Sequence, residues 1–135
     1  LPGFFGILGR LLRPGGKAVL QAITIPDARY KSYCANPDWI QKHIFPGGHL
    51  PSPGTIRNNA ERSGGLSFEC DAAFGGDYAR TLRCWREAFE TASERVAAMG
   101  FDGAFRRKWR YYLADCEAGF RAGLIDVQHV VLRKA

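Results

Sequence analysis

The chain has 135 residues, of which 46% are hydrophobic and 24% are charged, and its formal net charge is +6. This composition excludes a disordered tail, and no apolar run approaches the ~20 residues of a membrane-spanning helix. Residues 1–12 are apolar but are interrupted by Arg10 and have no basic leader, so we expect no signal peptide. The charge favours anionic partners, although an ordinary soluble domain with excess arginine fits the composition equally well.

The four cysteines and three histidines form no recognisable metal or redox motif. No two cysteines have C-x-x-C spacing, and the histidines are scattered along the chain. We therefore expect no metal site. Cys70, Cys84 and Cys116 fall on apolar faces of predicted elements, so we expect them to be buried free thiols.

The N-terminal part of the chain predicts a short helix, a turn and a strand. Residues 4–12 carry apolar side chains on one helical face, although Gly6 and Gly9 weaken the helix. Pro14-Gly15-Gly16 ends it. Residues 18–25 are apolar on both faces, which is typical of a strand inside a parallel or mixed sheet covered by helices. A polar loop is expected to follow.

Two further helices are expected before the middle of the chain. Asn36 is a candidate cap for a short helix that brings Trp39 and Phe45 near one another. A second helix is expected to run from Ser52 to about Ser63.

The second half of the chain predicts two strands and two long helices. Apolar side chains alternate over residues 66–74, which indicates a strand. Spacings of three and four over residues 82–99 predict a helix, and a last helix follows the turn at Asp102-Gly103. Residues 125–133 are expected to form a third strand.

Three strands and four to five helices indicate an α/β fold in a single domain over residues 1–135. A helix, a Pro-Gly-Gly turn and a buried strand normally occur late in a doubly wound domain, after the strands that hold the cofactor. No glycine-rich loop lies between a strand and a helix, so we expect no cofactor-binding residues in this chain.

Four stretches of the chain resemble the C-terminal half of the cyclopropane-fatty-acyl-phospholipid synthases, which are relatives of the mycolic acid cyclopropane synthases. The motifs IFPGGHLPS and YYLADCEAGFRAG are specific, whereas RPGG before a strand is weak because many methyltransferases have it. The stretches, in family order, are Leu11–Ile25 (LLRPGGKAVLQAITI), Asp38–Ser52 (DWIQKHIFPGGHLPS), Gly76–Trp85 (GDYARTLRCW) and Phe105–Arg133 (FRRKWRYYLADCEAGFRAGLIDVQHVVLR).

The resemblance implies the C-terminal half of a Rossmann-like, S-adenosylmethionine-dependent methyltransferase. Such an enzyme adds a methyl carbon to the double bond of an unsaturated phospholipid acyl chain, and a bound bicarbonate takes the proton that is lost on ring closure. The family's cofactor loop and its upstream cysteine and glutamate ligands have no counterpart here. The resemblance therefore implies S-adenosylmethionine and bicarbonate as cofactors of a complete enzyme, none for this chain alone, and no activity of this chain alone.

Three catalytic positions are implied by the resemblance. Tyr78 aligns with the tyrosine whose hydroxyl holds the bicarbonate, and Ile23 aligns with the residue whose backbone contacts the same ion. Gln21 stands where the best-known members have a histidine; a glutamine amide can bond an anion but cannot titrate near neutral pH. A methyl-branched product is then an alternative to a ring. Gln21 bonding a neighbouring loop, Ile23 serving as core and Tyr78 capping a helix remain the structural alternatives.

An apolar stripe is a candidate lining for the acyl chain, although helical stripes of this spacing are more often plain core. Its members, together with two aromatic residues from the short helix, are Tyr112, Cys116, Phe120, Trp39 and Phe45.

Four cations surround Trp109 near a predicted helix N-terminus, where the helix dipole disfavours positive charge. We interpret them as a surface for anionic lipid headgroups, and expect a cytoplasmic protein that is peripheral to the inner membrane surface. The alternative is a solvated basic face that pairs with Glu87, Glu90 or Glu94. The four cations are Arg106, Arg107, Lys108 and Arg110.

The family sheet places the strand at 18–25 beside a strand that is absent here, which would leave a long apolar edge. We therefore expect a homo-oligomer, or pairing with a separate N-terminal half. The rival interpretation is a non-catalytic remnant that binds lipid or a partner, favoured by Gly3, Gly6, Gly9 and the absent cofactor loop. Nucleic-acid binding is not expected, because the basic residues lack a recognition-helix or stacking pattern.

Overall fold

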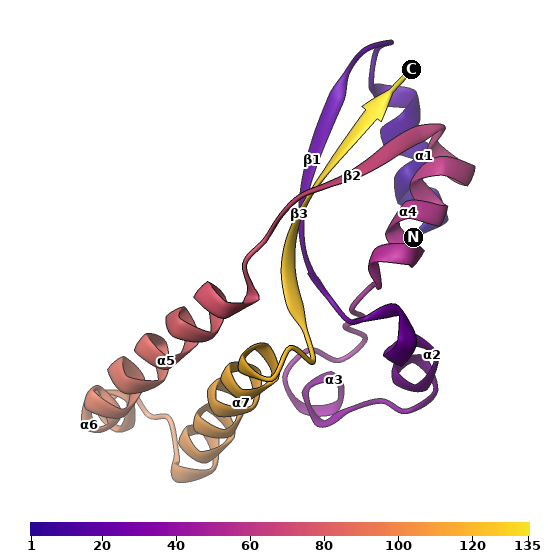
Figure 1. Cartoon of the computed structure of the whole chain (residues 1–135). Helices are drawn as coiled ribbons and strands as arrows, with labels where there is room; N and C mark the ends of the chain where they lie inside the picture. Colours follow the sequence, from indigo (N-terminus) through magenta and orange to yellow (C-terminus); the bar gives the residue numbers. More distant parts are fainter.

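Three strands form one antiparallel sheet in the computed structural model, which describes residues 1–135 (Figure 1). The strands are β1 (Lys17–Thr24), β2 (Leu66–Ala73) and β3 (Asp126–Lys134), in the order β1-β3-β2. Both outer strands run antiparallel to β3. The expectation that residues 18–25 lie inside a parallel or mixed sheet is therefore wrong for this chain, because the last strand inserts between the two earlier ones.

The helices outnumber those expected from the sequence. They are α1 (Pro2–Leu11), α2 (Asp27–Ala35), α3 (Trp39–His43), α4 (Pro53–Asn59), the π-helix η1 (Ala60–Gly64), α5 (Gly75–Thr91), α6 (Ser93–Ala98) and α7 (Gly103–Arg121).

The structure differs from the sequence prediction at α2, at the division between α5 and α6, and at the cap of α3. The segment expected as a polar loop is helix α2, and the long helix expected over 82–99 is divided at Ala92 into α5 and α6. Asn36 does not cap α3: its side-chain amide donates to the Ser32 carbonyl at the end of α2. Asp38 is the cap instead and forms a capping box with Gln41.

The chain has two hydrophobic cores at opposite ends of the sheet. The first lies where α1, α4 and η1 cover one face of the sheet, and its members include Phe5, Ile56 and Leu132. The second lies between α5 and α7 and includes Leu82, Phe120 and Val127, the last of these from β3. Figure 1 shows α5 and α7 as a pair that extends away from the sheet, with α7 on the side of α2 and α3.

Strand β1 is hydrogen-bonded to β3 on one side and has a free edge on the other. Its burial alternates along the strand, so that Ala18 and Leu20 pack on the first core while Val19 is 65% exposed. The open edge expected from the sequence is present in this chain. Pairing of that edge with another copy or another segment stays a prediction.

The expected burial of the cysteines is wrong for two of them. Cys70 and Cys84 are exposed, and so is Cys34, while Cys116 is half-buried. Cys70 lies on an edge strand beside a break in register, and Cys84 lies on the outer face of α5. No group of three or more histidine, cysteine, aspartate or glutamate side chains is placed to hold a metal ion, and no helix is long and apolar enough to cross a membrane.

Candidate functional site

Tyr78 lies in the first turn of α5 and packs against the second core. Its ring centroid is 5.0 Å from that of Phe120 and 6.2 Å from that of Trp85. Ile23, near the end of β1, pairs with Val127 on β3 and packs against the same core. The fold therefore brings two of the three predicted catalytic positions to one end of the sheet.

Gln21 contacts a strand and not a loop. It lies opposite His129 in the β1–β3 ladder, and its Oε1 is 3.0 Å from the His129 Nε2. The His129 ring packs edge-on against Phe74 with centroids 4.7 Å apart, and the Phe74 carbonyl accepts the Tyr78 backbone N–H at 3.1 Å. His129 thus connects Gln21 with the turn that carries Tyr78.

The start of α5 is fixed by a side chain from β3. The Asp126 carboxylate accepts the backbone N–H of Gly75 at 2.8 Å and that of Val127 at the same distance. A side chain at Gly75 would collide with that carboxylate, because a Cβ there would lie 2.6 Å from its Oδ1. Asp126 therefore determines where the first turn of α5, and so Tyr78, begins.

The five predicted lining residues do not form one surface: some lie where α3 and the segment after it meet α7, and Phe120 lies in the second core. Phe45 packs edge-on against Tyr112 with centroids 5.8 Å apart, but Trp39 packs against Tyr111, at 4.5 Å. Phe120 is 4% exposed and is a member of the core, as the structural alternative expected. Their role toward an acyl chain stays a prediction.

A cleft of about 690 Å³ separates α2 and α3 from α7, and ten of its sixteen lining residues are hydrophobic. Of the predicted lining residues, Cys116 borders it directly, near Asp115 on the same helix. The Tyr33 hydroxyl also borders the cleft and accepts the backbone N–H of Leu50 at 3.0 Å. The cleft is mostly apolar, and its charged lining residues are Arg29, Asp38 and Asp115.

Burial raises the pKa of two neighbouring residues of α7, Tyr112 and Cys116. It raises the pKa of Tyr112 to about 12 and that of Cys116 to about 11, with smaller contributions from neighbouring groups. Burial also raises the pKa of Asp115, and the nearby Asp38 adds to the effect. Cys116 and Tyr112 are therefore neutral at physiological pH and act as apolar walls, not as nucleophiles.

Cys116 is expected to be the slowest of the four thiols to react with iodoacetamide. Because its pKa of about 11 lies roughly three units above pH 8, only about one molecule in a thousand carries the reactive thiolate at that pH. Mass spectrometry of timed samples should show rapid modification of Cys34, Cys70 and Cys84, with Cys116 at least about tenfold slower. Equal rates in the folded protein would contradict the described burial, and equal rates in urea are the control.

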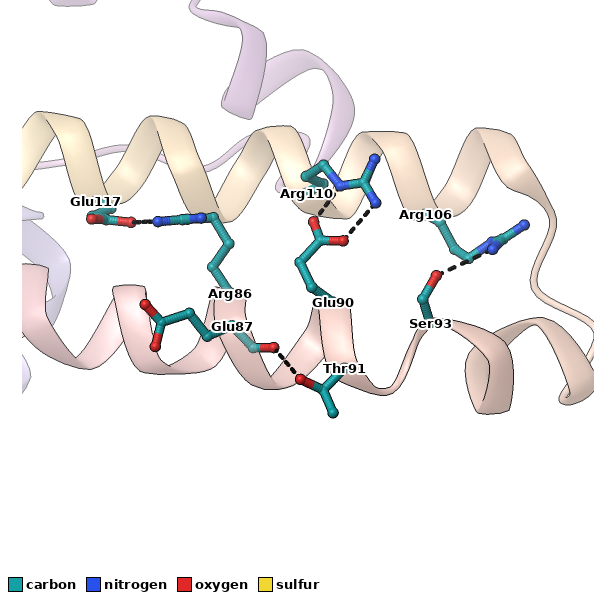
Figure 2. A network of polar contacts seen from close by, with 8 residues as sticks. All are labelled: Arg86, Glu87, Glu90, Thr91, Ser93, Arg106, Arg110 and Glu117. Atoms are coloured by element: carbon teal, nitrogen blue, oxygen red, sulfur yellow. Dashed lines mark hydrogen bonds and ion pairs between the residues drawn. The ribbon is translucent and has the colours of Figure 1, made fainter.

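The predicted cations differ in their surroundings (Figure 2). Arg110 forms a two-pronged ion pair with Glu90 of α5, as the solvated-face alternative expected, and this pair lowers the pKa of Glu90. Arg106 donates to the Ser93 hydroxyl at 3.2 Å. Arg107 and Lys108 are exposed and form no ion pair within the chain.

Sequence reasoning missed His129 as a candidate site residue, because it considered the histidines only as metal ligands. The signal that reveals it is the register of β1 against β3, which places His129 opposite Gln21.

The sequence model of the family described as mycolic acid cyclopropane synthetase matches residues 1–130. The chain belongs to this family. The resemblance stated from the sequence motifs is thereby confirmed, and so is an α/β fold that corresponds to a C-terminal portion of an S-adenosylmethionine-dependent methyltransferase.

Relatives of the cyclopropane synthetase family match nearly the whole chain. The tuberculostearic acid methyltransferase UfaA1 of Mycobacterium tuberculosis is 45% identical over 126 residues, which cover 93% of this chain and 30% of the relative. The cyclopropane-fatty-acyl-phospholipid synthase of Escherichia coli K12 is 34% identical over 131 residues, covering 97% of this chain and 32% of that enzyme.

Solved structures of the family agree with the fold. The cyclopropane synthase MmaA2 from Mycobacterium tuberculosis superimposes with a TM-score of 0.80 at 28% identity, covering 98% of this chain and 49% of that one. The cyclopropane synthase CmaA1 in complex with S-adenosylhomocysteine and CTAB gives a TM-score of 0.81 at 27% identity, with the same coverage. The chain spans about a third to a half of these relatives.

Proposed function

We propose that this chain is the lipid-side part of an enzyme that transfers a methyl group from S-adenosylmethionine to the double bond of an unsaturated phospholipid acyl chain. The observation that carries the proposal is the family match over residues 1–130. The cleft beside α7 supports it, because ten of its sixteen lining residues are hydrophobic and an acyl chain requires mainly apolar walls. Its charged lining residues are Arg29, Asp38 and Asp115.

The bicarbonate implied by the family fits the residues at the end of the sheet. When His129 donates from Nε2 to the Gln21 Oε1, the amide N–H groups of Gln21 are left free to donate to an anion. Bound bicarbonate would supply a proton acceptor. The Tyr78 hydroxyl would donate to the same anion, while its ring is held by Phe120 and its backbone by the first turn of α5.

The remaining residues of this chain orient the substrate and exclude water. Phe45 and Tyr112 form an aromatic wall, and Cys116 stays neutral, so these three side chains place no charge beside the acyl chain. S-adenosylmethionine would be held by residues outside this chain, in agreement with the absence of a glycine-rich loop between its strands and helices. We therefore expect no methyl transfer by this chain alone.

A chimera tests the proposed function. The segment of UfaA1 that matches this chain is replaced by residues 1–135, and transfer of labelled methyl groups to vesicles of unsaturated phospholipid is measured. We expect incorporation above background. Tyr78→Phe should lower the rate at least about tenfold, because it removes one donor to the anion while the ring keeps its packing.

The control is Tyr111→Phe, which removes an exposed hydroxyl from α7 and should leave the rate unchanged. A folded Tyr78→Phe chimera with full activity would remove Tyr78 from the proposed chemistry. A folded but inactive parent chimera, beside active UfaA1, would favour the non-catalytic remnant.

A further inference from the structure

The far end of the α5–α7 pair exposes apolar side chains at a turn. The segment between α6 and α7 lies at the end farthest from α1 and the first core (Figure 1). Met99 is 70% exposed there and Phe101 is 41% exposed. Gly100 has φ +93°, a conformation that permits the tight reversal between them. We call residues 95–109 the hairpin tip.

A column of stacked aromatic rings leads from the hairpin tip toward the cleft. Phe101 stacks on Phe105 with centroids 4.4 Å apart, and Phe105 stacks on Trp109 at 5.8 Å and an angle of 11°. Trp109 contacts Tyr112 at 5.3 Å, and Tyr112 contacts Phe45. The exposed Phe101 is thus the first member of a series of aromatic contacts along α7 that ends at the aromatic wall of Phe45 and Tyr112.

The hairpin tip carries more unpaired cations than carboxylates: its one carboxylate, Asp102, accepts the backbone N–H of Phe105 as the cap of α7. Arg95, Arg107 and Lys108 are exposed and take part in no ion pair within the chain, whereas Arg110 is paired with Glu90 and Arg106 is bonded to Ser93. Arg107 and Lys108 are the fifth and sixth residues of α7, and no carboxylate of α5 or α6 forms an ion pair with either of them. Their charges are therefore available to an anion outside the chain.

We propose that the hairpin tip inserts into the surface of an anionic lipid bilayer. Met99 and Phe101 enter the acyl region while Arg95, Arg107 and Lys108 contact phosphate groups at the headgroup level. Apolar side chains at an apex flanked by cations are what an interfacial segment requires. The aromatic column then offers an acyl chain a path from the bilayer along α7 to Tyr112. Only this last step rests on the proposed function.

The inference is tested by co-sedimentation of the chain with vesicles. Vesicles of phosphatidylglycerol and phosphatidylcholine should bind the chain, and Met99→Ser/Phe101→Ser should lower partitioning at least about tenfold, because two apolar side chains lose their burial in lipid. Arg107→Ala/Lys108→Ala should lower binding to the anionic vesicles about tenfold or more.

The matched control is Ile7→Ser/Leu11→Ser on α1, whose side chains are 51% and 78% exposed at the other end of the molecule. Its binding should stay within about twofold of the parent. Unchanged binding of Met99→Ser/Phe101→Ser, or an equal loss in the α1 control, would overturn the proposal. Circular dichroism confirms that each variant is folded. If the tip variants bind vesicles less well but the chimera is inactive, only the proposed enzyme activity is contradicted. If the chimera is active but the tip variants bind vesicles like the parent, only the membrane inference is contradicted.

Discussion

Replacing Gly9 by alanine is expected to destabilise the chain by about 2–3 kcal/mol, because the site has no room for a methyl group. Helix α1 crosses η1 at this position, and a Cβ on Gly9 would lie 2.8 Å from both the carbonyl carbon and the Cα of Gly64. These are backbone atoms, so the clash can be relieved only by moving one helix from the other. Phe5, which is 2% exposed in the first core, would move with α1.

The matched control is Gly3→Ala in the same helix, where no atom lies within 4 Å of the added Cβ. Alanine has the higher helix propensity, so this variant should be more stable by about 0.5–1 kcal/mol. Urea unfolding followed by circular dichroism measures both. A Gly9→Ala variant as stable as the parent would show that α1 does not make this close contact with η1.

These two glycines illustrate why the sequence predicts elements better than their roles. In the sequence, Gly6 and Gly9 only weaken a helix and, with Gly3, favour the interpretation as a remnant. In the structure, Gly9 is required by a helix crossing, whereas Gly3 faces open space. A crossing joins residues that are 55 positions apart, and no local pattern carries that information.

The elements that were predicted correctly have strong local signals at both ends. Turns at Gly15, Gly65 and Gly123 have positive φ, and they separate the elements where the sequence placed them. Helix α2 lacks such a signal, because none of its residues is buried and its pattern is polar. It is tied down instead from a distance, by the Asp27 carboxylate, which accepts the backbone N–H of Gly54 at 3.0 Å.

The candidate site was predictable only in part for the same reason. The motif that contains Tyr78 is local and could be aligned, and so could Gln21 and Ile23. The partner of Gln21 depends on the β1–β3 register, which joins residues 108 positions apart. Whether each cation near Trp109 is ion-paired, hydrogen-bonded or unpaired depends on which side chains of α5 and α6 lie opposite it. That arrangement follows from helix packing, which the sequence pattern does not specify.

Replacing Arg86 by alanine is the other change with a large expected effect on stability. Glu117 of α7 is 7% exposed, and its carboxylate accepts the Arg86 Nε–H at 2.9 Å and an N–H of Arg121 at 2.7 Å (Figure 2 shows the pair with Arg86). Without Arg86, a buried charge keeps a single partner whose side chain is 64% exposed. We expect a loss of about 2–3 kcal/mol in the free energy of unfolding, somewhat below the range for a fully buried pair because Arg86 is itself 33% exposed.

Two further variants separate the destabilisation caused by an unpaired Glu117 carboxylate from the stabilisation that the Arg86–Glu117 ion pair itself contributes. Arg83→Ala removes an exposed ion pair with Glu87 from the same helix and should change stability by less than about 0.5 kcal/mol. Arg86→Met/Glu117→Leu should recover most of the loss, because an apolar pair of similar volume leaves no charge to be solvated between α5 and α7. If the double variant is as unstable as Arg86→Ala, the ion pair itself holds the two helices together. Recovery would instead mean that the loss in Arg86→Ala comes from the unpaired Glu117 carboxylate between α5 and α7, the helices that carry Tyr78 and Tyr112.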